Sequence, residues 1–464
     1  MRLEWAGRTF NPNDSSLAGP EAGPPRVVLQ EEVGDGRNRV LQGDALDNAA
    51  ALLEEGYGGK VRVAYIDPPY LSATDYAYEA RLDGTKDGRV RRTHAFGDQW
   101  GEDGGAPRYL DMLAPRLHAL SRLLSDRGTL WVHLDWRASY LARVLLDEIF
   151  GRDAFLNEIV WRRAPNLGRQ AQSSQFGRTI DTILVYGKKD ATLVPPTRLE
   201  PIEKEAIRRD EDGRPFTAAP RGDYTDQSIE RLDAEGRVHR SKQGKVYIKY
   251  FLVKNERDEW CRERRVDSLW TDVAPIRHAR LEERTGYPTQ KPLALLERII
   301  SCASDPGDLV VDLFGGSGTT AEAAHRLGRK YIVGDAQSLA IATIRARLMR
   351  AGSHFVRQST IAGSVVEAPL EATVERHGDE TFEVRISSPV EPLAWWIEIE
   401  EGADGPLFSA TPRWKTIWHS ERGLGGKPAP IRDVARFSSR GPRLRVSAHD
   451  DEGKLYRMNW EIKR

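Results

Sequence analysis

Short apolar runs alternate with amphipathic stretches in two parts of the chain. Residues 61–66 form an apolar, β-branched run that is typical of a buried parallel strand. The same pattern predicts strands over 39–42, 128–134, 180–186, 309–313 and 331–334, and helices over 45–55, 109–124, 138–150, 293–303, 319–327 and 339–349. Strands that alternate with helices predict an α/β fold with a doubly wound, mostly parallel, Rossmann-like sheet.

Other stretches break this alternation. Residues 1–36 are rich in Gly, Pro, Asn and Asp and are predicted to be a poorly ordered or draped arm, and the polar residues 71–107 are predicted to be a long loop. Apolar and polar residues alternate over 381–386, 395–400 and 443–448, which predicts short antiparallel strands. We therefore expect an arm (1–36), two halves of one α/β domain (37–190 and 281–358), an insert between them (191–280) and a small C-terminal β-rich domain (359–464).

Composition narrows the class of protein. The 464 residues are 39% hydrophobic and 30% charged, with a formal net charge of zero, which fits a soluble globular protein of two or three domains. We find no apolar run of the length that a membrane helix or a signal peptide needs. With only Cys261 and Cys302, we expect neither a disulfide framework nor a metal site, and a cytoplasmic location.

A glycine-rich turn follows one of the predicted strands. The strand over 309–313 carries Asp312 near its end and leads into Phe314-Gly315-Gly316-Ser317-Gly318-Thr319, which opens a helix. Glycines let a ligand approach the backbone, and a helix N-terminus supplies free N–H groups. About twenty residues on, Asp335 ends the next strand, where a carboxylate can bind ribose hydroxyls. The turn matches neither G-x-G-x-x-G nor a P-loop, so an adenosyl ligand without a pyrophosphate fits best, and a structural turn is the alternative.

A second motif, Asp67-Pro68-Pro69-Tyr70, lies just past the strand over 61–66. Open α/β sheets place their active sites at this end of the strands. The prolines fix the backbone, so that Asp67 and the Pro68 carbonyl are two acceptors in a rigid frame beside the Tyr70 ring. This set suits a planar heterocycle with an exocyclic amine, and such a base has to leave the duplex to reach it. A Pro-Pro turn without a ligand is the alternative.

Together these motifs resemble the amino-group DNA methyltransferases that use S-adenosylmethionine, in the beta-class motif order. The resemblance covers roughly residues 38–190 and 266–352. In chain order, its motifs are Gln42-Gly43-Asp44, the Asp67–Tyr70 motif, Asn157-Glu158-Ile159-Val160-Trp161, the stretch from Trp270-Thr271-Asp272 to Gly286-Tyr287-Pro288-Thr289-Gln290-Lys291-Pro292, and the turn from Asp312 to Thr320.

The resemblance implies roles for these positions. Asp67, Pro68, Pro69 and Tyr70 would hold the target base and orient its amine toward the methyl donor. The residues expected around S-adenosylmethionine are Asp44, Thr289, Gln290, Lys291, Asp312, Phe314, Gly315, Gly316, Ser317, Gly318, Thr319 and Asp335. The amine would attack the sulfonium methyl directly, so positioning would supply most of the catalysis.

Contacts to double-stranded DNA are expected from local positive charge, because the whole chain is neutral. Two stretches, 161–189 and 237–265, are rich in Lys and Arg, and aromatic residues are interleaved in the second. The residues expected to contact DNA are Arg162, Arg163, Arg169, Lys242, Lys245 and Lys249. A solvated charged face is the alternative.

Adenine N6 is the expected target, because D-P-P-Y is the common form among adenine enzymes, and cytosine N4 is the alternative. An RNA adenine methyltransferase would be expected to carry D-P-P-W, and a binding module without activity would be expected to lose one of the motifs. Neither cysteine follows a proline, which disfavours a C5-cytosine enzyme. We find no nuclease or helicase signature, so a restriction endonuclease partner would be a separate protein. The C-terminal domain is a candidate for DNA contact or for homodimer formation.

Overall fold

The computed structural model describes residues 3–5, 7–12, 27–33, 38–81, 90–101, 105–165, 174–241, 243–360, 368–369, 372–377, 381–386, 394–401, 413–421, 434–438, 443–449 and 455–461. These residues group into two compact units. One unit is Val194–Asp267, and the other comprises Met1–Leu193 and Ser268–Arg464. The smaller unit falls inside the stretch 191–280 that the sequence predicts as an insert, while the domain boundaries themselves stay predictions.

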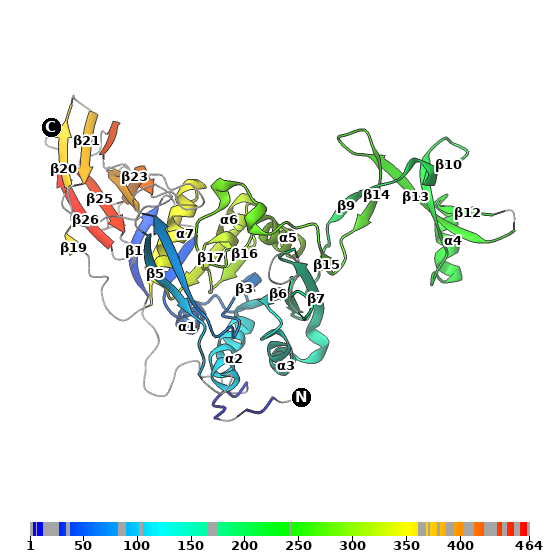
Figure 1. Cartoon of the computed structure of the whole chain (residues 1–464), viewed down its shortest axis with the longest axis horizontal. Helices are drawn as coiled ribbons and strands as arrows, with labels where there is room; N and C mark the ends of the chain where they lie inside the picture. Colours follow the sequence, from blue (N-terminus) through cyan, green and yellow to red (C-terminus); the bar gives the residue numbers. More distant parts are fainter. Residues whose placement is uncertain are drawn as a thin grey trace. The chain divides into compact units, whose positions relative to one another are not determined.

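A ten-stranded sheet forms the centre of the larger unit (Figure 1). Its order is β1-β18-β2-β17-β16-β3-β6-β8-β7-β15. The strands are, in chain order, β1 (Val28–Val33), β2 (Arg39–Gln42), β3 (Val61–Ile66), β6 (Leu124–Leu134), β7 (Phe155–Arg162), β8 (Ile180–Gly187), β15 (Leu269–Trp270), β16 (Leu309–Asp312), β17 (Lys330–Asp335) and β18 (Phe355–Ser359). From β18 to β6 all neighbours run parallel, whereas β8 pairs antiparallel with β6 and β7. The predicted α/β class with a mostly parallel sheet is confirmed.

Helices cover both faces of this sheet (Figure 1). One group comes from the first half of the chain, and its helices pack on one another: α1 (Ala45–Glu54), α2 (Ala106–Leu123) and α3 (Ser139–Phe150). The other group is α5 (Leu293–Ala303), α6 (Thr319–Arg326) and α7 (Ser338–Arg350). Every residue of β3 is buried, as expected for a strand with helices on both sides. The strand order reverses between β16 and β3, and open α/β sheets bind ligands at such a switch point.

One expectation about the irregular segments is wrong, and the predicted arm contains a strand. The predicted loop 71–107 contains an antiparallel hairpin, β4 (Asp75–Arg81) and β5 (Val90–Gly97). Ala95 and Phe96 of this hairpin pack against Tyr287 and the first turn of α7. The predicted arm contributes β1, which pairs with β18. In its first residues, the Trp5 indole also donates to Asp111, 2.7 Å away, so this part of the arm is docked on α2.

The smaller unit is a six-stranded antiparallel sheet with one helix. Its elements are β9 (Thr197–Pro201), β10 (Arg208–Arg209), β11 (Pro215–Pro220), α4 (Asp226–Ala234), β12 (Val238–Arg240), β13 (Val246–Lys254) and β14 (Trp260–Arg265). Ile229 and Leu232 of α4 pack on Val238 and Ile248 to form its small core.

The C-terminal part is built of strands. They are β19 (Ala368–Pro369), β20 (Ala372–Arg376), β21 (Thr381–Ile386), β22 (Ala394–Glu401), β23 (Arg413–Glu421), β24 (Val434–Ser438), β25 (Arg443–His449) and β26 (Leu455–Glu461). They form a five-stranded and a three-stranded sheet. Throughout the described part of the chain, no helix has the length and apolar character that a membrane span needs.

Candidate active site

A cavity of about 320 Å³ lies at the carboxyl ends of β3, β16 and β17. It brings together predicted residues from five separate segments of the chain. The predicted residues that line it are Asp44, Asp67, Pro69, Thr289, Gln290, Lys291, Asp312, Phe314, Gly315, Gly316, Ser317, Thr319 and Asp335. Three predicted residues do not line the cavity, although each is adjacent in sequence to one that does: Pro68, Tyr70 and Gly318.

The glycine-rich turn is packed too tightly for side chains. A Cβ atom on Gly315 would lie 2.4 Å from Cγ2 of Val333 and 3.1 Å from the Gly334 carbonyl oxygen. Gly318 has a φ of +77° and is the N-cap of α6, with the backbone of Ile344 3.1 Å from where its Cβ would be. The first of these glycines allows close packing on β17, and the second allows the left-handed turn into the helix.

Two buried carboxyl groups hold this turn. Asp312 accepts hydrogen bonds from the Thr320 hydroxyl at 2.6 Å and from the Phe314 N–H at 3.0 Å. Asp335 accepts from the Gly316 N–H at 2.9 Å. Burial raises the pKa of Asp312 to about 7 and the pKa of Asp335 to about 6, although these hydrogen bonds pull both values down.

The carboxylate of Asp67 is engaged on both oxygens. The Tyr70 hydroxyl donates to Oδ1, and the Lys291 ammonium donates to Oδ2. Burial raises the pKa of the Tyr70 phenol well above its usual value, so the group keeps the proton that it donates. The Tyr70 ring stacks on His133 with the centroids 6.2 Å apart, and Pro68 is buried. The motif is therefore a fixed frame with its acidic group at the cavity wall.

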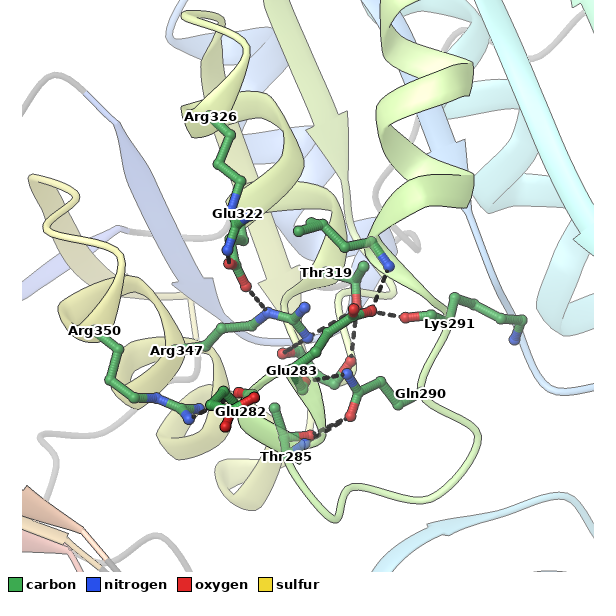
Figure 2. Close-up of polar contacts among 12 residues, drawn as sticks. Glu282, Glu283, Thr285, Gln290, Lys291, Thr319, Glu322, Arg326, Arg347 and Arg350 are labelled. Atoms are coloured by element: carbon green, nitrogen blue, oxygen red, sulfur yellow. Dashed lines mark hydrogen bonds and ion pairs between the residues drawn. The ribbon is translucent and has the colours of Figure 1, made fainter. Parts of the chain in front are cut away.

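The segment that carries Lys291 is held by its own polar contacts (Figure 2). The Gln290 side chain accepts from the Thr285 N–H at 2.8 Å and donates to the Glu283 carbonyl at 2.8 Å. The Lys291 carbonyl accepts from the Thr319 hydroxyl at 3.1 Å, which joins this segment to the glycine-rich turn. Gln290 thus lines the cavity while its amide group stabilises the loop.

A buried arginine supports the same turn from α7 (Figure 2). Arg347 donates to the Thr319 hydroxyl at 2.9 Å and to the carboxylate of Glu322. Because Arg347 and Glu322 are both buried, the arginine needs this carboxylate as its counter-charge. Together they fix the first turn of α6 behind the cavity.

Several lining residues were not found from the sequence. Tyr65, Phe96, Trp100, Arg116 and Tyr287 all line the cavity. Arg116 on α2 donates to Asp44 at 2.5 Å, and Asp44 is also the N-cap of α1, where it accepts from the Leu46 N–H. Asp44 was expected from the Gln42-Gly43-Asp44 motif, whereas its arginine partner lies in a distant helix that local spacing does not connect to it.

The residues expected to contact DNA fall in both units. Arg162 and Arg163 are at the end of β7, where Nε of Arg163 lies 2.7 Å from Asp181 Oδ1. Lys245 is exposed just before β13, and Lys249 lies on that strand. Arg169 and Lys242 lie outside the described residues.

A family model and several known proteins match this chain in sequence. The model of a family described as DNA methylase matches residues 61–344. The type II methyltransferase M.EcaI of Enterobacter cloacae is 31% identical over 317 residues, which are 62% of this chain and 65% of that protein. The Mod subunit of the type III restriction-modification enzyme StyLTI of Salmonella typhimurium is 26% identical over 343 residues, 63% of this chain and 50% of that protein.

Two solved structures align with about two thirds of this chain. A complex of M1.HpyAVI with SAM aligns with a TM-score of 0.38 and 18% identity, over 67% of this chain and 98% of that chain. A PvuII DNA methyltransferase described as cytosine-N4-specific aligns with a TM-score of 0.36 and 17% identity, over 69% of this chain and 90% of that chain.

The match to the curated relatives is partial in length. This chain spans about two thirds of M.EcaI and half of the StyLTI subunit. The family match, by contrast, spans residues 61–344, from β3 into α7, which is well over half of the 464 residues. The chain therefore belongs to the N6/N4 DNA methylase family.

Proposed function

We propose that this protein transfers a methyl group from S-adenosylmethionine to the exocyclic amine of a base in DNA. The observation that carries the proposal is that a single cavity is lined both by Asp67 and by the glycine-rich turn from Phe314 to Ser317. Direct transfer of a methyl group requires that the methyl donor and the base amine lie in contact. A motif that holds the base and a turn that binds the nucleoside would meet this requirement when both lie at one switch point of the sheet.

The residues present fit the proposed cofactor. Gly315, Gly316 and Ser317 line the cavity, and Asp335 is a carboxylate at the end of the next strand, where it would accept ribose hydroxyls. Gly315, Ser317 and Gly318 would lie along the methionine part, with Thr289, Gln290 and Lys291 flanking its carboxylate. Asp44 would contact the adenine. When bound, the cofactor would supply a methyl group on a positively charged sulfur.

The chain's own residues would hold the acceptor base. Asp67 and the carbonyl of Pro68 would accept the N–H groups of the amine, which directs its lone pair toward the methyl group. The Tyr70 ring would contact the flat face of the base. A base reaches such a site only when it is flipped out of the duplex. Adenine N6 is the proposed target because this chain carries the D-P-P-Y form, and cytosine N4 is the second candidate, since its amine has the same geometry.

Double-stranded DNA is the proposed partner. Four basic residues would contact phosphates: Arg162, Arg163, Lys245 and Lys249. The insert, residues 191–280, lies in the chain between the two methyltransferase halves, 37–190 and 281–358, and would read the target sequence. The β-rich part, 359–464, would contact DNA or a second copy of the chain. Any restriction endonuclease that works with this chain would be a separate protein.

The test is nucleoside mass spectrometry of genomic DNA from a host that expresses the protein, with an Asp67→Ala variant as the matched control. N6-methyladenine with the wild type alone would support the proposal. N4-methylcytosine would keep the cofactor and the site and change the base. Unmodified DNA from cells that contain the folded wild-type protein would contradict the proposal, and modified RNA in those cells would move the activity to RNA.

A further inference from the structure

The carboxylate of Asp98 accepts hydrogen bonds from the backbone at the end of the Asp67–Tyr70 motif and just after it. It accepts three consecutive N–H groups, from Tyr70 at 3.0 Å, Leu71 at 2.9 Å and Ser72 at 2.6 Å. The Trp100 indole N–H is a fourth donor, at 2.7 Å. Asp98 is 1% exposed, so these four bonds form away from bulk water, where a charged acceptor binds N–H groups strongly.

This stretch of backbone needs an acceptor. Leu71 has a φ of +61° and Ala73 a φ of +55°, and neither is glycine. The left-handed region is disfavoured for residues with a Cβ atom, so the chain occupies it only where other contacts hold it there. The Asp98 carboxylate provides such contacts at Leu71 and on both sides of it.

Tyr70 is fixed at both ends by this arrangement. Its N–H is bound to Asp98, and its hydroxyl donates to Asp67. Asp98 itself does not line the cavity, whereas its neighbours Phe96, Gly97 and Trp100 do. It follows the β4–β5 hairpin in the chain, and its N–H donates to the Thr74 carbonyl at 3.0 Å, which closes the hairpin at its base. One carboxylate therefore joins the hairpin wall of the cavity to the base-holding motif.

We propose that Asp98 is a positioning residue for methyl transfer, which holds Tyr70 and through it the Asp67 carboxylate in the orientation that receives the base. This inference rests on the proposed function. Asp98 acts through Tyr70, so its loss reduces the rate of transfer and leaves the cofactor contacts of the glycine-rich turn in place.

The experiment compares purified wild type with Asp98→Asn. Asparagine keeps the size of the side chain but replaces one acceptor oxygen with an N–H donor and removes the charge, so the convergent N–H groups lose an acceptor. We expect kcat to fall about 100-fold, the effect of a misplacement of about 1 Å in a positioned reaction. The dissociation constant of S-adenosylhomocysteine, measured by calorimetry, should change less than about threefold, since Asp98 does not touch the cavity. Asp308→Asn is the matched control: Asp308 also accepts a backbone N–H in a turn, from Asp305 at 2.8 Å, and its substitution should leave kcat unchanged.

A double-mutant cycle separates positioning from general support of the fold. If Asp98 acts through the Tyr70 side chain, then Asp98→Asn should lower kcat by less than about threefold in a Tyr70→Ala background. An undiminished loss in that background would overturn the inference, and so would a wild-type kcat for Asp98→Asn. If Asp98→Asn does not fold, Asp98→Glu serves instead. It keeps the charge and both acceptors but displaces them by one methylene, and the same split between kcat and cofactor affinity is expected. A wild-type protein without methyl transfer contradicts the proposed function, whereas an active wild type with an equally active Asp98 variant contradicts only this inference.

Discussion

The ammonium group of Lys291 donates to the carboxylate of Asp67, although 224 residues separate the two in the chain. Their side chains are 9% and 18% exposed, so the pair is largely shielded from water. Lys291 also lies 3.3 Å from the Thr289 carbonyl and 5.2 Å from the centre of the Tyr70 ring. The contact joins the segment proposed for the cofactor to the motif proposed for the base. A base amine that binds Asp67 therefore has to share or replace the ammonium group as a donor.

Replacement of Lys291 by methionine should weaken cofactor binding. Methionine keeps most of the apolar stem but has no charge for the carboxylate of the cofactor, and a hydrogen bond to a charged group contributes roughly 1.5–3 kcal/mol. We expect the dissociation constant of S-adenosylhomocysteine to rise by about 10- to 100-fold in calorimetry. Lys60→Met, at an exposed lysine of the same unit, is the control and should bind as the wild type does. Equal affinity of Lys291→Met and wild type would contradict this role.

Asp67→Asn should separate chemistry from cofactor binding. The amide has nearly the same shape, but it offers one acceptor where the carboxylate has two, and its NH₂ group opposes the N–H donors of the base. We expect kcat to fall by about 10²–10³, as for the loss of one preorganised electrostatic contact in a transition state. The affinity for S-adenosylhomocysteine should stay within about threefold of the wild type, because the glycine-rich turn is untouched. A variant that methylates DNA at the wild-type rate would show that Asp67 does not hold the amine.

The elements that were predicted correctly carry local signals. The run Val61–Ile66 is apolar and β-branched, and prolines follow it at once, so both the strand and the place of Asp67 could be predicted. The strand that ends in Asp312 and the helix that begins at Thr319 are likewise marked by the glycines between them. Such features depend on a few neighbouring residues, which the sequence displays directly.

What was missed depends on contacts between distant segments. The β4–β5 hairpin is polar and lacks a regular apolar alternation, so its sequence resembles that of a loop. Its Ala95 is buried against Tyr287 and α7, and Phe96 packs beside it. Asp98, bound to N–H groups 26 to 28 residues earlier in the chain, is an ordinary surface residue by its sequence. Long-range pairs of this kind follow from the fold and not from local periodicity.

Gly315→Ala should damage the glycine-rich turn. The added Cβ atom would lie 2.4 Å from Val333 Cγ2, and the nearby Gly334 carbonyl leaves it little room to move. Overpacking of this kind destabilises proteins by about 1–3 kcal/mol, which corresponds to a fall of roughly 1–3 °C in Tm for a chain of this size. Cofactor affinity should fall as well. The control is Gly58→Ala, whose Cβ would be an ordinary 3.5 Å from Leu53. Thermal unfolding and calorimetry give the two readouts, and wild-type values for both would remove the turn from the proposed site.

Cofactor affinity should depend on pH through Asp335. Burial raises the pKa of this carboxyl to about 6. Its two oxygens already accept the N–H groups of Gly316 and Gln337, so a proton on either oxygen would oppose a donor, and the ionised form is the stronger acceptor for a ribose hydroxyl. The group is ionised at pH 8 and mostly protonated at pH 5, so affinity should be full at the higher pH and fall as pH drops through 6. Below that value the loss approaches tenfold per pH unit, or about tenfold in total by pH 5.

The Asp335→Asn variant tests the assignment of that titration. It should bind S-adenosylhomocysteine weakly at pH 8 and show a flatter profile between pH 8 and pH 5, because its amide does not titrate. Asp312 titrates in the same range, since burial raises its pKa to about 7, so Asp312→Asn is measured in parallel. If the pH dependence persists in Asp335→Asn and disappears in Asp312→Asn, the titrating group is Asp312, and the proposed role of Asp335 is contradicted.

Lys245→Ala should weaken DNA binding without any effect on the cofactor. Lys245 is exposed just before β13, in the basic stretch of the smaller unit, where a lysine can release one counterion by contact with a phosphate. The slope of log K against log salt concentration should become shallower by about one, and by the same amount on every DNA sequence, because phosphate contacts carry no base specificity. Lys204→Ala, an exposed lysine of the same unit outside that stretch, is the matched control. Fluorescence anisotropy with a labelled duplex at several salt concentrations measures both variants. An unchanged slope for Lys245→Ala would contradict the phosphate contact and favour the alternative of a solvated charged face.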